Sequence, residues 1–336
     1  MNVHVIKPGA LSTLQDLGRF GYQRYGVIVD GVMDEWSHRA ANILVGNPES
    51  EATLEMTLVG PTLRFDDTTL IAICGADLSP RAGEREVPMD APVLLRAGTR
   101  LEFGRRRSGC RAYLAVNGGY AVASVMESKS TYLRGGFGGF QGRALQKDDT
   151  IAIGRSEATN HYRSLTRMLG ANDDPFSAPP FDVMTRSARD ASAAPSVRVV
   201  AGPQWHGFTD AAQRQFLDSE FVVTPNSDRM GYRLQGAKLA PREAIEMISE
   251  GVSFGTVQVP QDGNPIILMA DCQTIGGYPK IAQVASVDLP LLAQMIPGQT
   301  VRFALTSLDE AQRLYLARQH DFAQILQSLS QLKQES

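Results

Sequence analysis

Polar loops in the second half of the chain carry the side chains best suited to chemistry. They occupy residues 224–233, 255–260 and 271–280, each between short apolar runs. Loops held by strands commonly carry binding sites, because a rigid scaffold positions them. The catalytic candidates are Asn226, Arg229 and Gln258, and the substrate-binding candidates are Gln273, Thr274, Tyr278 and Lys280.

These residue types suit the recognition of an amide or a carboxylate. Amide side chains both donate and accept hydrogen bonds, and a guanidinium presents a planar fork of donors. An amide carbonyl that becomes an oxyanion needs donors where the charge develops, and Asn226, Arg229 and Gln258 are of that type. A structural role is the alternative: Arg229 pairing with Asp228, and Gln258 and Gln273 satisfying strand ends.

Several common catalytic motifs are missing from the sequence. The 5 histidines are scattered without a pair at ligand spacing, so we expect no metal site. The glycine-rich run at 135–143 matches neither a P-loop nor a dinucleotide fingerprint, although Arg143 and backbone N–H groups there could hold an anion. No G-x-S-x-G elbow occurs. The chain therefore either binds without catalysing or contributes polarising groups to a site completed elsewhere.

Bulk properties restrict the partners and the compartment. A formal charge of -3 offers no reservoir of positive charge for nucleic acid. The 3 cysteines are widely spaced in apolar sequence, which indicates reduced core thiols. The amino terminus lacks a signal-peptide pattern, and no apolar run is long enough to cross a membrane. We therefore expect a cytoplasmic protein with no membrane or nucleic-acid partner.

Short runs of Val, Ile, Leu and Phe between glycine- and proline-rich breaks predict a mainly β fold. Two helices interrupt it. Asp34 can cap a helix over 35–45, and Gly46 can end that helix. Apolar residues at helical spacing predict a second helix over 308–332, which either packs on its own barrel or docks a partner.

A shift toward Ser, Ala, Pro, Asn and Asp marks a domain boundary between residues 155 and 196. We predict an N-terminal β-barrel domain at 1–154, a linker at 155–196, a C-terminal β-barrel domain at 197–307 and a C-terminal helix at 308–336. Motifs of the first half, such as that at residues 16–22, recur in the same order in the second half. This faint repeat indicates two tandem barrels of one fold.

A series of short stretches in a fixed order carries a family resemblance. Among them are P-G-A-L-S-T-L-Q-D-L-G-R at 8–19, G-F-G-G-F-Q-G-R at 136–143, S-D-R-M-G-Y-R-L-Q-G at 227–236, Q-V-P-Q-D-G-N-P-I at 258–266 and D-C-Q-T-I-G-G-Y-P-K at 271–280. On these stretches the chain resembles the allophanate hydrolase subunit 2 family, also called the biotin-dependent carboxyltransferase or KipA-type family. The members that serve as the C subunit of 5-oxoprolinase are the most similar.

The resemblance implies two cyclophilin-like β-barrels with a few short helices. It also implies one component of an ATP-dependent 5-oxoprolinase, which opens 5-oxoproline to L-glutamate. Its partners would be the A subunit of that enzyme and the B subunit, which is similar to allophanate hydrolase subunit 1. The chain would be inactive alone, and ATP would be bound by the complex. In urea carboxylase relatives, an Asn that matches Asn226 lines the substrate site.

Two alternatives stay open. One is a carboxyltransferase component that moves carboxyl from carboxybiotin to urea or a urea-like substrate. The other is a regulatory protein that antagonises an inhibitor of a sensor kinase. The sequence carries no A-M-K-M-type biotin attachment site, so we expect no biotin on this chain and favour the oxoprolinase.

Overall fold

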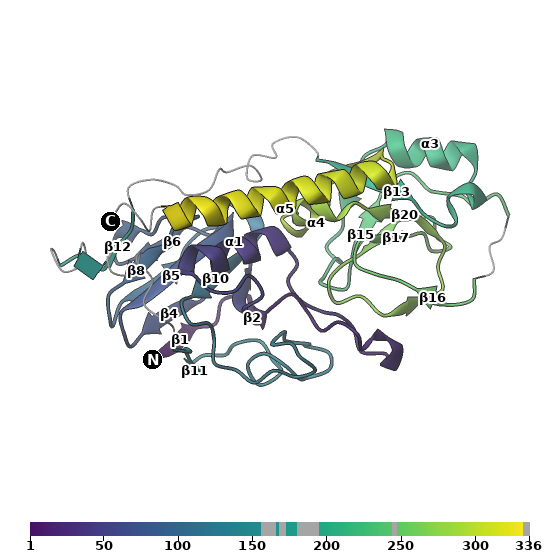
Figure 1. Cartoon of the computed structure of the whole chain (residues 1–336). Coiled ribbons are helices and arrows are strands. Elements are labelled where there is room, and N and C mark those ends of the chain that lie inside the picture. The colour runs from purple at the N-terminus through teal and green to yellow at the C-terminus, as the bar shows by residue number, and fades with distance from the viewer. Residues whose placement is uncertain (156–165, 168–172, 180–194, 244–246, 332–336) are drawn as a thin grey trace. The chain divides into compact units, whose positions relative to one another are not determined.

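The computed structural model describes residues 1–155, 166–167, 173–179, 195–243 and 247–331 (Figure 1). Strands dominate these ranges, which confirms the predicted mainly β fold. Within them, no helix has both the length and the apolar character needed to span a bilayer.

The chain divides into two compact units, each built from separate stretches of sequence. The first comprises Met1–Gly18, Asp34–Arg189 and Asp321–Ser336, and the second comprises Arg19–Met33 and Asp190–His320. An early segment thus belongs with the later barrel. The predicted domain limits stay a prediction, because most of the expected linker lies outside the described residues.

Two six-stranded sheets form the first unit, in the orders β11-β1-β4-β9-β6-β7 and β12-β8-β5-β10-β3-β2. The strands of the first sheet are β1 (Asn2–Lys7), β4 (Thr62–Phe65), β6 (Pro80–Ala82), β7 (Arg85–Glu86), β9 (Arg100–Phe103) and β11 (Thr150–Ala152). Those of the second are β2 (Leu11–Gln15), β3 (Thr53–Thr57), β5 (Thr69–Asp77), β8 (Val93–Leu95), β10 (Ser108–Val116) and β12 (Phe176–Ser177). Both sheets contribute side chains to one apolar core, including Val5, Leu63 and Leu114.

Helix α1 (Glu35–Val45) packs against β5 and β10 of the first unit. Its boundaries confirm the sequence prediction: Asp34 accepts a hydrogen bond from the Ser37 N–H at 3.0 Å, and Gly46 ends the helix with φ 78. The side-chain oxygen satisfies a backbone donor that has no partner within the helix, and glycine adopts the left-handed conformation without strain.

A buried histidine lies on the inner face of α1. The Nδ1 atom of His38 is 2.8 Å from Thr53 Oγ1, and the side chain is fully enclosed. Burial lowers the pKa of His38 from 6.5 to about 4, although the negative charges of Asp16 and Glu55 oppose this shift. Removing a charged imidazolium from water is costly, so the folded protein holds His38 neutral.

This neutrality predicts a loss of stability in acid. The unfolded chain protonates His38 below pH 6.5 while the fold resists protonation down to about 4. Stability is therefore complete above pH 6.5 and falls as the pH drops toward 4, by about 3 kcal/mol. Urea unfolding of the first unit, followed through Trp36 fluorescence in a Trp205→Phe background, measures it. The free energy of unfolding of His38→Gln should not show this fall between pH 6.5 and 4. Parallel plots of unfolding free energy against pH for the two proteins would contradict the prediction.

The second unit contains a closed barrel in the order β13-β20-β17-β18-β15-β14-β21. Its strands are β13 (Ser196–Ala201), β14 (Phe221–Val223), β15 (Gly231–Gln235), β17 (Thr256–Gln258), β18 (Ile266–Leu268), β20 (Lys280–Val284) and β21 (Thr300–Leu305). A separate pair consists of β16 (Glu250–Gly251) and β19 (Ile275–Gly276). Short helices complete the unit: η1 (Gln23–Tyr25), η2 (Trp205–Gly207), α3 (Asp210–Asp218), η3 (Ser286–Asp288) and α4 (Leu289–Ala293).

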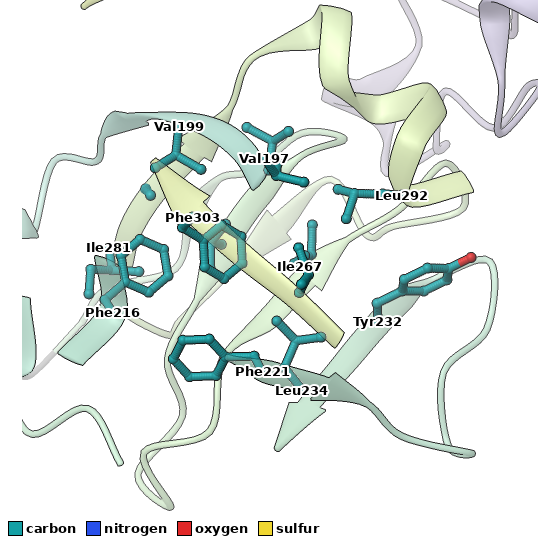
Figure 2. Close-up of a cluster of buried hydrophobic side chains, with 14 of the residues drawn as sticks. Val197, Val199, Phe216, Phe221, Tyr232, Leu234, Ile267, Ile281, Leu292 and Phe303 are labelled. Atoms are coloured by element: carbon teal, nitrogen blue, oxygen red, sulfur yellow. The ribbon is translucent and has the colours of Figure 1, made fainter. Parts of the chain in front are cut away.

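Aliphatic and aromatic side chains together form the buried core of this unit (Figure 2). Phe216 of α3 stacks on Phe303 of β21 with ring centroids 4.4 Å apart, and Phe221 packs beside both. Met33, from the early segment, belongs to the same buried cluster. The segment Arg19–Met33 is thus fixed to the second unit in part by apolar burial.

The terminal helix α5 (Leu308–Gln331) confirms the helix predicted near the end of the chain, although Leu332 lies outside the described residues. Phe322, in its first-unit part, is buried with its ring centroid 4.1 Å from that of Trp36. This contact supports packing within the protein. Leu308 and Leu316 are exposed on the earlier part of the helix.

Candidate functional site

A buried ion cluster surrounds Arg229, which lies between β14 and β15. Its Nε donates to both oxygens of Asp271 at 3.1 and 3.0 Å, and its Nη2 donates to Asp271 Oδ1 at 2.7 Å. The same Nη2 donates to Asp30 Oδ1 at 3.1 Å and to the carbonyl of Gly31. The second oxygen of Asp30 accepts from Arg19 Nη1 at 2.9 Å. All of these residues belong to the second unit.

Local turns aim these side chains. The Asp228 carboxylate accepts from the N–H groups of Met230 and Gly231, at 2.8 and 3.2 Å, and so stabilises the turn that carries Arg229. The N–H of Asp271 donates to the Arg229 carbonyl at 2.8 Å. Arg229 thus reaches ion-pair partners 42 and 199 positions away in sequence.

The charged groups of the cluster act on the pKa of Asp30 in opposite directions. Burial and the neighbouring Asp271 carboxylate raise the pKa of Asp30, while Arg229 and Arg19 act in the opposite direction. Asp30 is also in the left-handed backbone region, with φ 61. A non-glycine residue there is strained, so its placement indicates that the surrounding contacts hold it.

A second group of polar side chains lies around Gln258, the last residue of β17. Gln258 is buried, and its Nε2 donates to the Tyr278 carbonyl at 3.4 Å. A Cβ on Gly276 would lie 2.5 Å from that nitrogen, so the amide packs directly on glycine backbone. Lys280 is paired with Gln258 in the strand register, and its Nζ forms an ion pair with Glu250.

The loop from Asp271 to β19 connects the two groups. Gln273 and Thr274 lie on it, both half-buried, and the Thr274 carbonyl accepts from the Val252 N–H at 3.1 Å. The ring of Tyr278 follows β19 and is exposed. These side chains therefore lie on one segment, residues 271–280. Its first residue, Asp271, bonds to Arg229, and its last, Lys280, begins β20.

Strand register shows how far the structure brings the candidates together. Gly231, next to the Arg229 turn, pairs with Leu268, whereas Gln258 pairs with Ile266. Arg229 and Gln258 are therefore associated with opposite ends of β18. Asn226 is exposed in the turn after β14. Their roles in catalysis and binding stay predictions.

Sequence reasoning had not selected Asp30, Arg19, Asp271 or Glu250 as site residues. Asp271 is the first residue of the 271–280 loop. Its position as a charged residue directly after an apolar run could have indicated a functional role. Asp30 had no local signal, because its partner Arg229 is 199 positions away.

The glycine-rich run of the first unit has a different role from the anion site considered for it. Both terminal nitrogens of Arg143 donate to the Asp149 carboxylate, each at 2.7 Å. A Cβ on Gly142 would lie 2.1 Å from the Gly136 carbonyl oxygen, so the backbone itself is closely packed. The run is a tight connection whose arginine is bound within the protein.

Neither cysteines nor metal ligands provide another centre in the part of the chain that the structure describes. Cys74, Cys110 and Cys272 are buried and form no disulfide, as predicted for core thiols. Burial and the nearby Asp271 raise the pKa of Cys272 to about 12, which keeps the thiol protonated. Across the same described ranges, no group of three or more His, Cys, Asp or Glu side chains could hold a metal ion.

Replacing the central guanidinium should destabilise the second unit. Arg229→Leu leaves two buried carboxylates without their shared partner, and we expect a loss of about 3–5 kcal/mol. Urea unfolding followed through Trp205 fluorescence, in a Trp36→Phe background, measures it. Arg302→Leu is the control, because its pair with Glu220 is exposed and contributes less than about 1 kcal/mol. Equal losses of unfolding free energy in both variants would show that the buried cluster stabilises the unit no more than the exposed ion pair does.

Comparisons with known proteins agree on one family. Residues 25–305 match the family model described as carboxyltransferase domain, subdomain A and B. The C subunit of 5-oxoprolinase from Haemophilus influenzae is 37% identical over 312 residues, covering 93% of this chain and 94% of that protein. The Escherichia coli protein of the same name is 36% identical over 322 residues, covering 96% of each.

Longer proteins match over part of their length. The urea amidolyase of Saccharomyces cerevisiae is 32% identical over 328 residues, covering 93% of this chain but 17% of that protein. The crystal structure of Kluyveromyces lactis urea amidolyase aligns with a TM-score of 0.83 at 29% identity, over 96% of this chain and 20% of that one. From the family model and these relatives, the chain belongs to the carboxyltransferase domain, subdomain A and B, family.

Proposed function

We propose that the chain is one component of an ATP-dependent 5-oxoprolinase, which opens 5-oxoproline to L-glutamate with the A and B subunits and is inactive alone. One observation carries the proposal. The alignments span 94% and 96% of two proteins named as the C subunit of 5-oxoprolinase, against 17% of a urea amidolyase. ATP is bound by the assembled complex in this scheme, and no biotin is attached to this chain.

The polar residues of the second unit suit such a substrate. The lactam of 5-oxoproline is a resonance-stabilised amide, so its carbonyl must be polarised before water attacks, and ATP can activate it by phosphorylating its oxygen. Donors of the type of Asn226, Arg229 and Gln258 stabilise the charge that develops on that oxygen. In this proposal Gln273, Thr274, Tyr278 and Lys280 bind the rest of the molecule.

Lys280 offers a specific way to bind the substrate carboxylate. Its side chain is nearly buried, whereas that of its partner Glu250 is 49% exposed. A substrate carboxylate can replace Glu250 at the ammonium without leaving a buried charge unpaired, because the displaced Glu250 is already close to water.

A second candidate is a carboxyltransferase component that moves carboxyl from carboxybiotin to a urea-like substrate. The family description and the TM-score of 0.83 with urea amidolyase favour it. Urea presents the same planar N–C=O group as a lactam, so the same donors would serve either substrate.

Reconstitution tests the leading proposal. We expect co-expression with the A and B subunits to give a complex that releases glutamate from 5-oxoproline only with ATP present. The chain alone should release none. A complete complex that hydrolyses no 5-oxoproline would refute the oxoprolinase, and carboxylation of urea from a carboxylated biotin carrier would establish the second candidate instead.

Asn226 provides a test of the site. Because this side chain is exposed, Asn226→Ala should leave the free energy of unfolding within about 0.5 kcal/mol of the parent protein. Loss of a donor to the developing oxyanion should lower kcat about 100-fold in the assembled complex. Arg214→Ala, exposed on α3, is the matched control and should retain full activity. Full activity in Asn226→Ala would remove this residue from the site.

A further inference from the structure

Two carboxylates in the second unit meet at one nitrogen atom. Arg229 Nη2 donates to Asp30 Oδ1 at 3.1 Å and to Asp271 Oδ1 at 2.7 Å. The two acidic groups are therefore direct neighbours, although they come from distant parts of the sequence. Like charges at this separation repel each other in a medium that water does not screen.

The surroundings of the pair are enclosed on one side only. The side chain of Asp30 is fully buried and is paired with the equally buried Arg19. The side chain of Asp271 is 9% exposed, and the chain continues from Asp271 into the partly buried residues of the 271–280 loop. The charged and titratable groups that face the pair are Arg19, Arg229 and Cys272, and the thiol stays neutral. Asp271 is thus the member closest to solvent.

The backbone turn at Asp30 is fixed by its surroundings. Asp30 has φ 61, in the left-handed region, and Gly31 follows with φ 95. A glycine at position 30 would adopt this conformation more readily but would remove the carboxylate. The same Arg229 nitrogen also binds the Gly31 carbonyl, so the turn and the carboxylate are held together.

Burial and the Asp271 charge favour the protonated form of Asp30 and outweigh the two arginines. In a coupled pair of this kind, the proton belongs to both groups and leaves in steps shared by both.

We propose that Asp30 and Asp271 hold one proton between them, and that Asp271 exchanges it with the substrate. The inference rests on the proposed oxoprolinase reaction. When water adds to the carbonyl carbon whose oxygen ATP has phosphorylated, the C–N bond breaks and its electron pair stays on nitrogen. The product is an acyl phosphate, which a second water hydrolyses to glutamate and inorganic phosphate. The carboxyl pair gives its proton to that nitrogen and regains one from the attacking water. Asp30 is a positioning residue, and Asp271 is the group that meets the substrate.

Carboxyl titration tests the shared proton without any activity. In the full chain labelled with carboxyl-¹³C aspartate, we expect one NMR signal to titrate well above the ordinary aspartate range near 3.9. Asp30→Asn should abolish it, and Asp271→Asn should move it to lower pH, because the neighbouring charge is removed while Asp30 stays buried. Asp288→Asn should keep it, because Asp288 is buried in a separate pair with Arg198. A wild-type protein without such a signal, or a signal that Asp271→Asn leaves at the same pH, overturns the proposal.

Kinetics of the assembled complex then test the role in the reaction. Asp271→Asn should lower kcat by about 10²–10⁴-fold with little change in KM. Asp30→Asn should move the alkaline limb of the pH–rate profile to lower pH, because it removes the buried carboxyl whose pKa is raised. Asp288→Asn should leave the profile in place. An unchanged profile in Asp30→Asn refutes the role, whereas an inactive wild-type complex refutes the oxoprolinase and leaves the titration to decide the pair.

Discussion

Charge matching inside the second unit organises the parts around it. Arg19 and Arg229 face Asp30 and Asp271 where little or no water reaches them. Any of these groups, if it were charged and buried alone, would cost several kcal/mol, so the four side chains must be positioned together. Their segments are far apart in sequence, and the ion cluster thereby joins the early Arg19–Met33 segment to a barrel built much later in the chain.

The position of the 271–280 loop depends on this cluster. Its first residue, Asp271, bonds to Arg229 through both backbone and side chain. Its last residue, Lys280, is fixed by the β17–β20 register opposite Gln258. A loop held at both ends restricts the orientations of Gln273 and Thr274 between them. If this loop binds the substrate as proposed, such restriction lowers the entropic cost of binding.

Local signals made some features predictable. The cap at Asp34, the stop at Gly46 and the apolar spacing of the terminal helix each act within a few residues, so α1 and α5 follow from sequence. The β17–β20 pairing also brought Gln258 and Lys280 together from loops chosen for their residue types. The Asp30–Arg229 pair could not be found in this way, because no local pattern specifies a contact across 199 positions.

The relatives carry names for two chemistries, and the shared donors explain how one scaffold suits both. A lactam and urea present the same planar N–C=O group, so amide and guanidinium donors do not distinguish them. The carboxylate of 5-oxoproline, which urea lacks, does distinguish the two substrates. In the proposed function, an exchangeable partner at Lys280 gives affinity only to a substrate that brings a negative charge, and the side chain of Glu250 is 49% exposed. Selection for 5-oxoproline over urea should therefore depend more on this ion pair than on the groups that polarise the carbonyl.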